Sequence, residues 1–208
     1  YWNKGYAIHV HVTGDLGLEL AIDTLEKLQF ERPRFYHGFT LEHFGLSTPE
    51  QVYRLSKLGA NVSANAYYLY ELSDIYANHS VGYERASSMA RIGSCFREGV
   101  TTGLHSDFTM APAQPLMSMW VAVNRVNEKG ETMSAEERIS SQQALEAVTI
   151  NAARILGLDD QIGSIRSGKK ADFTVLSEDP LSIDPLKIKD INIEATVFEG
   201  KVFNIKKL

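Results

Sequence analysis

The chain has 208 residues, with 21 lysines and arginines against 26 aspartates and glutamates, and a net charge of −5. Apolar residues make up 44% and charged residues 23%, a composition typical of a folded domain and not of a disordered one. The acidic balance gives no electrostatic basis for nucleic-acid binding, and no apolar run approaches the roughly 18 residues of a membrane helix. Cys95 is the only cysteine, which excludes an intrachain disulfide and a cysteine-based zinc site.

The first residues have the pattern of a buried strand inside a domain. Residues 7–12 are an apolar, strand-like segment that carries His9 and His11, and no initiating methionine or signal peptide precedes it. A buried strand this close to the first residue suggests that the beginning is missing. We therefore expect a fragment of a longer protein and, because no targeting segment is visible, a cytoplasmic one.

The first half of the chain alternates strand and helix signals. Short apolar strands are expected at residues 7–12, 40–44, 61–64 and 101–105. Helices are expected at about 18–28, 49–58 and 88–98, with a long aromatic loop before the last of these. The second helix has the clearest limits, because Thr48 and Gln51 form a capping-box pattern at its start and Gly59 ends it. Strands alternating with helices predict a parallel sheet with helical crossovers.

The character of the chain changes near residue 160. Before it we expect a helix at 117–126, a capping box from Ser134 to Glu137, and an amphipathic helix at 141–155. After it we expect only short strands, at residues 162–165, 173–176, 194–198 and 201–205. Glu199–Gly200 is predicted to form the tight turn between the last two. The predicted domains are therefore residues 1–160 and 161–208.

Metal-ligand side chains end three of the four predicted parallel strands. His11 ends the first, His43 the second, and His105 with Asp107 the fourth; 32 residues separate His11 from His43, and 64 separate His43 from Asp107. The first spacing matches one strand–helix–strand unit and the second matches two, and the carboxyl ends of parallel barrel strands converge. Imidazole and carboxylate groups suit Zn²⁺. A histidine at a strand end is nevertheless common on ordinary surfaces, so spacing alone leaves both interpretations open.

Four motifs in this order resemble the amidohydrolase superfamily, in its YtcJ-like branch. They are His11-Val12-Thr13-Gly14-Asp15, Leu41-Glu42-His43, His105-Ser106-Asp107, and the segment from Gly163-Ser164 to Gly168-Lys169-Lys170-Ala171-Asp172. The resemblance covers nearly the whole chain. It implies the C-terminal half of a (β/α)8 TIM barrel, strands five to eight, followed by part of a small β-sandwich domain. The first half of the barrel, with its His-x-His motif and its fourth-strand ligand, is not in this sequence.

The resemblance also implies roles for particular residues. His11 and His43 match metal ligands of the fifth and sixth strands, and Asp107 matches an aspartate that binds metal and acts as general base. His9 precedes the matched ligand by two residues and is expected to support the site, although a His9–His11 metal pair is an open alternative. The implied cofactor is zinc or another divalent metal, one or two ions in the full-length protein.

Three further residues are candidates for substrate binding. His105 stands where many relatives carry glycine, and Tyr68 belongs to an aromatic cluster expected on the catalytic face. Arg85 is a candidate partner for a substrate carboxylate. Packing is the structural alternative for Tyr68 and a salt bridge that for Arg85, and His105 is expected near the metal or the substrate.

The expected function is metal-dependent hydrolysis of a C–N bond in an amide, formamide or cyclic amide, with the fragment itself inactive. A silent truncated chain that serves only as an assembly module is the alternative, as is a small metal-binding protein. The expected partner is a small amide-type substrate, with no nucleic acid and no membrane. Because half a barrel leaves two strand edges and an apolar interior face, we also expect a homo-oligomer or association with the missing N-terminal half.

Overall fold

A computed structural model describes residues 1–205 and contains a four-stranded parallel sheet. Its strands are β1 (His9–Val12), β2 (Thr40–His43), β3 (Asn61–Asn65) and β4 (Thr101–His105), and they lie side by side in chain order. Each neighbouring pair is parallel. The predicted strands, their direction and their order are therefore confirmed.

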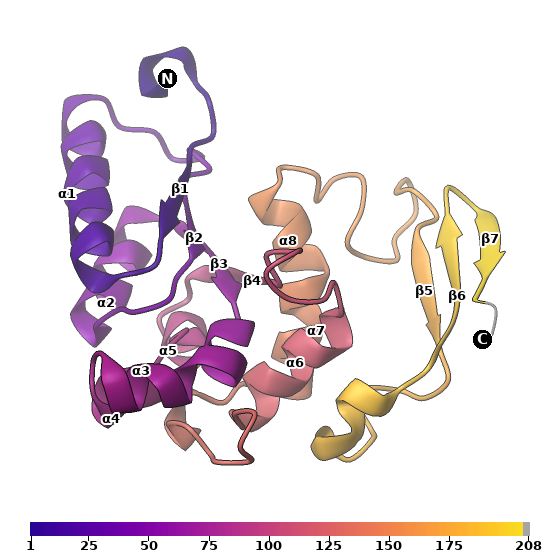
Figure 1. The fold of residues 1–208 in the computed structure, drawn as a ribbon. Coiled ribbons are helices and arrows are strands. Elements are labelled where there is room, and N and C mark those ends of the chain that lie inside the picture. Colours follow the sequence, from indigo (N-terminus) through magenta and orange to yellow (C-terminus); the bar gives the residue numbers. More distant parts are fainter. Residues whose placement is uncertain (206–208) are drawn as a thin grey trace.

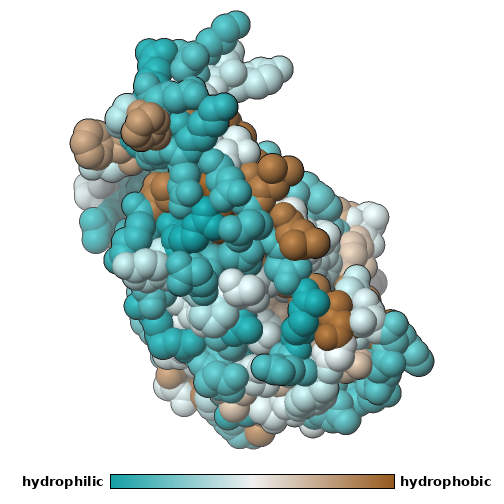
Figure 2. All heavy atoms as spheres, turned by 90° about the vertical axis from the view of Figure 1, so that its left-hand side faces the viewer, coloured by the Kyte–Doolittle hydropathy of each residue, from teal (hydrophilic) through white to brown (hydrophobic). Residues whose placement is uncertain are grey.

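Helices follow the first two strands as the periodicity predicts. α1 (Asp15–Glu31) and α2 (Pro49–Leu58) pack beside each other and cover the sheet on the left of Figure 1. The capping box of Thr48 and Gln51 is present, and Gly59 ends α2 at a φ of 67°. That left-handed conformation explains the glycine, because a Cβ would make it costly. Figure 2 shows a largely hydrophilic face over this side, with separate apolar patches.

The predicted aromatic loop is instead helical. Residues after β3 form a π-helical turn (Tyr68–Leu72), α3 (Ser73–His79) and α4 (Tyr83–Ser87). These pieces are too short to display a helical repeat in the sequence, and their buried positions are set by packing. The next helix, α5 (Ile92–Arg97), is shorter than the predicted 88–98, because Ala90 has a φ of 46° that a right-handed helix does not allow.

The segment after β4 contains α6 (Pro115–Asn124), α7 (Ser141–Val148) and α8 (Ile150–Ile155). The predicted helix at 141–155 is broken at Thr149. The predicted capping box at Ser134 is wrong: a 3-10 turn (Ala135–Glu137) follows it, and the capping box forms at Ser140 and Gln143.

The C-terminal part is a three-stranded antiparallel sheet of β5 (Phe173–Leu176), β6 (Ile193–Phe198) and β7 (Lys201–Asn204), on the right of Figure 1. The predicted strand at 162–165 is absent from the described residues, which hold one small sheet here and not two packed sheets. A 3-10 helix (Pro185–Asp190) returns to α6, where Trp120 Nε1 donates to the Leu186 carbonyl at 2.9 Å and Ile188 is fully buried. A further 3-10 turn (Trp2–Lys4) precedes β1.

The two faces of the parallel sheet differ in chemistry. Leu41, Val62 and Ala64 are fully buried in the apolar core. On the other face of the central strands, Glu42 contacts His9 on β1 and His105 on β4. The expectation of an apolar interior face is therefore wrong at the carboxyl ends of the strands, where the alternation of side chains directs polar groups to that face. No helix within residues 1–205 combines the length and apolarity needed to cross a membrane.

Candidate active site

The parallel register brings His11, His43, His105 and Asp107 to one edge of the sheet. Val12 pairs with His43, and Asn65 pairs with His105, so the strands end at nearly the same level. The ring centroids of His11 and His43 are 4.5 Å apart, and those of His43 and His105 are 5.1 Å apart. Nδ1 of His43 lies 3.6 Å from Oδ2 of Asp107. Residues that are up to 96 positions apart in the chain thus form one cluster.

The backbone of this cluster is unusual at two ligand candidates. His43 has a φ of 70° and Asp107 a φ of 53°, both in the left-handed region. Non-glycine residues occupy this region at a cost of about 1–3 kcal/mol, and such residues are enriched at functional sites. The turn at His43 continues into the fully buried Phe44, which anchors it.

The electrostatics of the cluster favour neutral imidazoles. Burial lowers the pKa of His43, and the carboxylate of Asp107 opposes this effect. Burial, followed by the neighbouring His43, lowers the pKa of His105. Neutral imidazole is the form that binds a metal ion, so both rings have the protonation state that a metal ligand needs.

The donor set fits a divalent metal in its chemistry. His11 and His43 offer imidazole nitrogens and Asp107 offers a carboxylate, a combination found in hydrolytic zinc sites. Nδ1 of His43 is buried without a hydrogen-bond partner, as expected of a nitrogen meant for another ligand. Among residues 1–205, no three His, Cys, Asp or Glu side chains already stand in a geometry that would hold an ion. The candidate ligands therefore lie close together without forming a finished coordination sphere.

Glu42 belongs to the Leu41-Glu42-His43 motif, but the sequence predicted no role for it. Nδ1–H of His9 donates to Oε1 of Glu42 at 2.5 Å, and Nε2 of His105 lies 3.9 Å from Oε2. Burial acts to raise the pKa of Glu42, but hydrogen bonds from His9 and Ser63 outweigh it and hold the pKa below its usual value. A charged residue inside a short apolar strand, paired with His11 in the parallel register, was the available signal.

Tyr68 and Arg85 occupy different positions relative to the cluster. The Tyr68 ring is nearly parallel to that of His43, with a centroid distance of 6.2 Å and an interplanar angle of 22°. Arg85 is instead paired with Asp15 at the start of α1, with 2.5 Å between Nη2 and Oδ2. Tyr68 is thus beside the candidate ligands, and Arg85 is engaged at the helix that follows His11.

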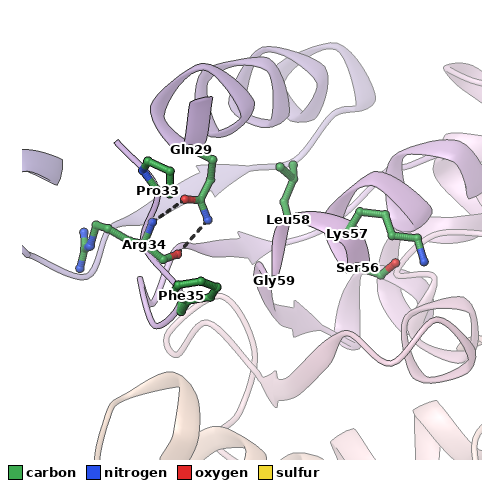
Figure 3. Close-up of a pocket in the computed structure, with 8 residues that line it drawn as sticks. All are labelled: Gln29, Pro33, Arg34, Phe35, Ser56, Lys57, Leu58 and Gly59. Carbon is green, nitrogen blue, oxygen red and sulfur yellow. Dashed lines mark hydrogen bonds between the residues drawn. The ribbon is translucent and has the colours of Figure 1, made fainter. Parts of the chain in front are cut away.

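Several cavities lie outside this cluster, and one lies at its margin. A cavity of about 400 Å³ is lined by Gln29, Pro33, Arg34, Phe35, Ser56, Lys57, Leu58 and Gly59. Figure 3 shows that the Gln29 amide is bonded to both backbone groups of Arg34, so this polar side chain is satisfied within the protein. A cavity of about 200 Å³ adjoins the cluster, where His105 lines it together with Leu104 and Gln114.

Comparison with known proteins agrees with the motifs. The model of the amidohydrolase family matches residues 3–203. The chain belongs to the amidohydrolase family.

Comparison with individual relatives shows what share of their length this chain matches. An N-substituted formamide deformylase of Arthrobacter pascens is 25% identical over 85% of this chain and 32% of its own length. The putative amidohydrolase YtcJ of Bacillus subtilis is 26% identical over 96% of this chain and 37% of its own. An uncharacterized metal-dependent hydrolase of Pyrococcus horikoshii superposes with a TM-score of 0.72 at 26% identity, over 88% of this chain and 36% of that structure. The chain spans about a third of the length of these amidohydrolase relatives.

Proposed function

We propose that this chain forms part of a metal-dependent hydrolase that cleaves the C–N bond of an amide, a formamide or a cyclic amide. The observation that carries the proposal is the meeting of His11, His43 and Asp107 at the carboxyl ends of parallel strands. Two relatives support the chemistry, because one is a formamide deformylase and another a metal-dependent hydrolase.

Each residue has a definite task in this proposal. His11, His43 and Asp107 would hold zinc or another divalent ion, one or two in the whole protein. Such an ion lowers the pKa of a water and polarises the substrate carbonyl. The Asp107 carboxylate accepts the proton as the water oxygen attacks the carbonyl carbon, and returns it to the departing nitrogen. The C–N bond breaks after the C–O bond has formed and the nitrogen has taken up the proton, which yields a carboxylic acid and an amine, joined in one molecule where the amide is cyclic.

We further propose that the four parallel strands are strands five to eight of a barrel. Within the described residues, β1 pairs only with β2 and β4 only with β3, so both edges are open to further strands. Exposed backbone groups on such edges favour pairing. We expect an N-terminal half, or a second copy of the chain, to cover them, and we expect the 208 residues alone to bind zinc weakly and to be inactive. Light scattering that finds a dispersed monomer would argue against this arrangement.

The test uses the full-length protein that contains this chain. We expect it to bind zinc by elemental analysis and to hydrolyse members of a formamide and cyclic-amide panel. His43→Ala and Asp107→Ala should each abolish both properties, whereas His79→Ala, on the exposed end of α3, should leave them unchanged. Full activity in either site variant would overturn the assignment.

The other two interpretations fit the site less well. A small metal-binding protein built on the His9–His11 pair would use Nε2 of His9, because Nδ1 is bonded to Glu42, and it would give no role to His43 and Asp107, which lie next to His11. A catalytically silent assembly module would give no reason for His11, His43 and Asp107 to meet at the carboxyl ends of the strands. Hydrolysis by the full-length protein would reject both.

A further inference from the structure

The carboxylate of Glu42, on β2, lies between the side chains of His9 and His105. Oε1 accepts a 2.5 Å hydrogen bond from Nδ1 of His9 on β1, and Oε2 faces Nε2 of His105 on β4 at 3.9 Å. One side chain on β2 therefore approaches histidines of β1 and β4.

His105 connects this carboxylate to the candidate base. The backbone N–H of Asp107 donates to Nδ1 of His105 at 3.0 Å. Because a backbone N–H only donates, Nδ1 accepts, and the neutral ring carries its hydrogen on Nε2. That Nε2 is buried without a hydrogen-bond partner among the described residues, and it faces Oε2 of Glu42. The imidazole is thus bonded to the left-handed turn at Asp107 through Nδ1, and its Nε2 lies near the Glu42 carboxylate, beyond hydrogen-bond distance.

We propose that Glu42 is a positioning residue, which fixes the ring of His105 and through it the backbone of Asp107. The inference rests on the proposed function, since it explains how the base is oriented. Glu42 does not touch the reacting atoms in this scheme, because Oε1 is taken by His9 and Oε2 faces His105. A carboxylate that accepts a ring N–H of a histidine sets the tautomer and direction of the ring.

A purely structural role for Glu42 makes a different prediction. If Glu42 only ties strands together, its loss and the loss of His105 damage the protein by separate routes, and their effects multiply. If Glu42 acts through His105, removing either one breaks the same connection, and removing both does little more. A double-mutant cycle separates the two cases.

The cycle uses Glu42→Ala, His105→Ala and the double variant in the full-length protein, with Glu50→Ala on the exposed face of α2 as control. We expect Glu42→Ala to lower kcat about 10- to 100-fold with KM changed less than about threefold. The double variant should be no slower than the slower single variant, and the control should equal the wild type. A double variant whose loss is the product of the single losses would overturn the proposal.

A second readout does not depend on turnover. The ¹⁵N spectrum of histidine-labelled protein distinguishes a protonated from an unprotonated ring nitrogen, and the His105→Ala spectrum assigns the His105 signals. We expect a single Nε2–H tautomer in the wild type and in Glu50→Ala. In Glu42→Ala the ring is no longer kept in place on the Asp107 N–H, so we expect that bond to be lost in part and a tautomer mixture to appear. An unchanged single tautomer in Glu42→Ala would show that the Asp107 N–H alone fixes the ring, and would overturn the proposal. If the wild type hydrolyses no amide, the proposed function fails while this spectrum still tests Glu42.

Discussion

Arg85 and Asp15 are 70 residues apart in the chain, yet Nη2 of Arg85 lies 2.5 Å from Oδ2 of Asp15. The pair joins α4 to the first turn of α1, four residues beyond His11. Asp15 also suits the partial positive charge of a helix N-terminus. The helical segment after β3 is therefore tied to the strand end that carries a candidate ligand.

Replacing Arg85 with alanine should cost little stability, because the pair is partly exposed: the Arg85 side chain keeps 50% of its accessible surface. We expect a loss below about 1 kcal/mol by urea unfolding, and a smaller loss in high salt.

If Arg85 also binds substrate, KM of the full-length enzyme should rise for substrates with a carboxylate and not for neutral ones. Arg166→Ala, at an exposed turn, serves as control, and an equal rise of KM for both substrate classes would reject this role.

Gly45 and Gly17 form a matched pair of substitution sites. A Cβ on Gly45 would lie 2.5 Å from the Thr13 carbonyl oxygen and 3.1 Å from Cδ2 of Tyr68, whereas one on Gly17 meets nothing within 4 Å. Gly45→Ala should destabilise the fold by about 1–3 kcal/mol and displace Tyr68 from His43. Gly17→Ala, in the first turns of α1, should stabilise it by up to about 1 kcal/mol. Thermal unfolding measures both, and equal effects at the two sites would contradict the packing argument.

The sheet and the meeting of the ligand candidates could be predicted because their signals are local and periodic. Each strand is a short apolar run with a polar residue at its carboxyl end, and one strand–helix unit sets the spacing from His11 to His43. Parallel order then brings the ends together without further information. Glu42 was missed because its role depends on His9 and His105, which reach it from other strands.

Long-range contacts account for the errors as well. Ser134-x-x-Glu137 and Ser140-x-x-Gln143 carry the same capping pattern, and only the second forms a capping box. The Glu137 side chain accepts a hydrogen bond from Ser94, 43 residues earlier, and does not bond the backbone of Ser134. No sequence window of helical length contains that partner, so the pattern alone could not decide between the two serines.

His37 should make the stability of the protein dependent on pH. The residue is 2% exposed. Nδ1 accepts from the N–H of Phe39, and Nε2–H donates to the Leu58 carbonyl. This pair of hydrogen bonds needs a neutral ring, because a protonated Nδ1 could not accept. Burial lowers the pKa of His37 in the folded state. The unfolded chain therefore takes up a proton first, and this contribution to stability is complete above about pH 6.5 and declines as pH falls below it.

The measurement compares urea unfolding of the wild type and His37→Gln between pH 7.5 and 5.5. One such group changes the free energy of unfolding by at most about 1.4 kcal/mol per pH unit. We expect the wild type to lose more stability over this interval than the variant does, while His79→Gln, on the protein surface, keeps the wild-type slope. Parallel pH curves for wild type and His37→Gln would show that His37 is not responsible.

Glu137 is a buried carboxylate whose removal should be strongly destabilising. It is 1% exposed, and it accepts hydrogen bonds from the backbone N–H and the hydroxyl of Ser94, at 2.7 and 2.5 Å. Its Oε1 also lies 3.6 Å from Nη1 of Arg91 and 3.3 Å from Nη2 of Arg97. This carboxylate joins the loop before α7 to α5, and through α5 to the sheet.

Glu137→Ala should therefore lower the free energy of unfolding by about 3–5 kcal/mol, because it leaves the partly buried Arg91 and the Ser94 donors without their acceptor. Glu137→Gln should lose less, since the amide oxygen can still accept from Ser94. Glu136→Ala is the control, because that side chain is exposed and only its backbone carbonyl contacts Arg97. Urea unfolding ranks the three variants. Equal losses for Glu136→Ala and Glu137→Ala would mean that the buried network contributes nothing specific to stability.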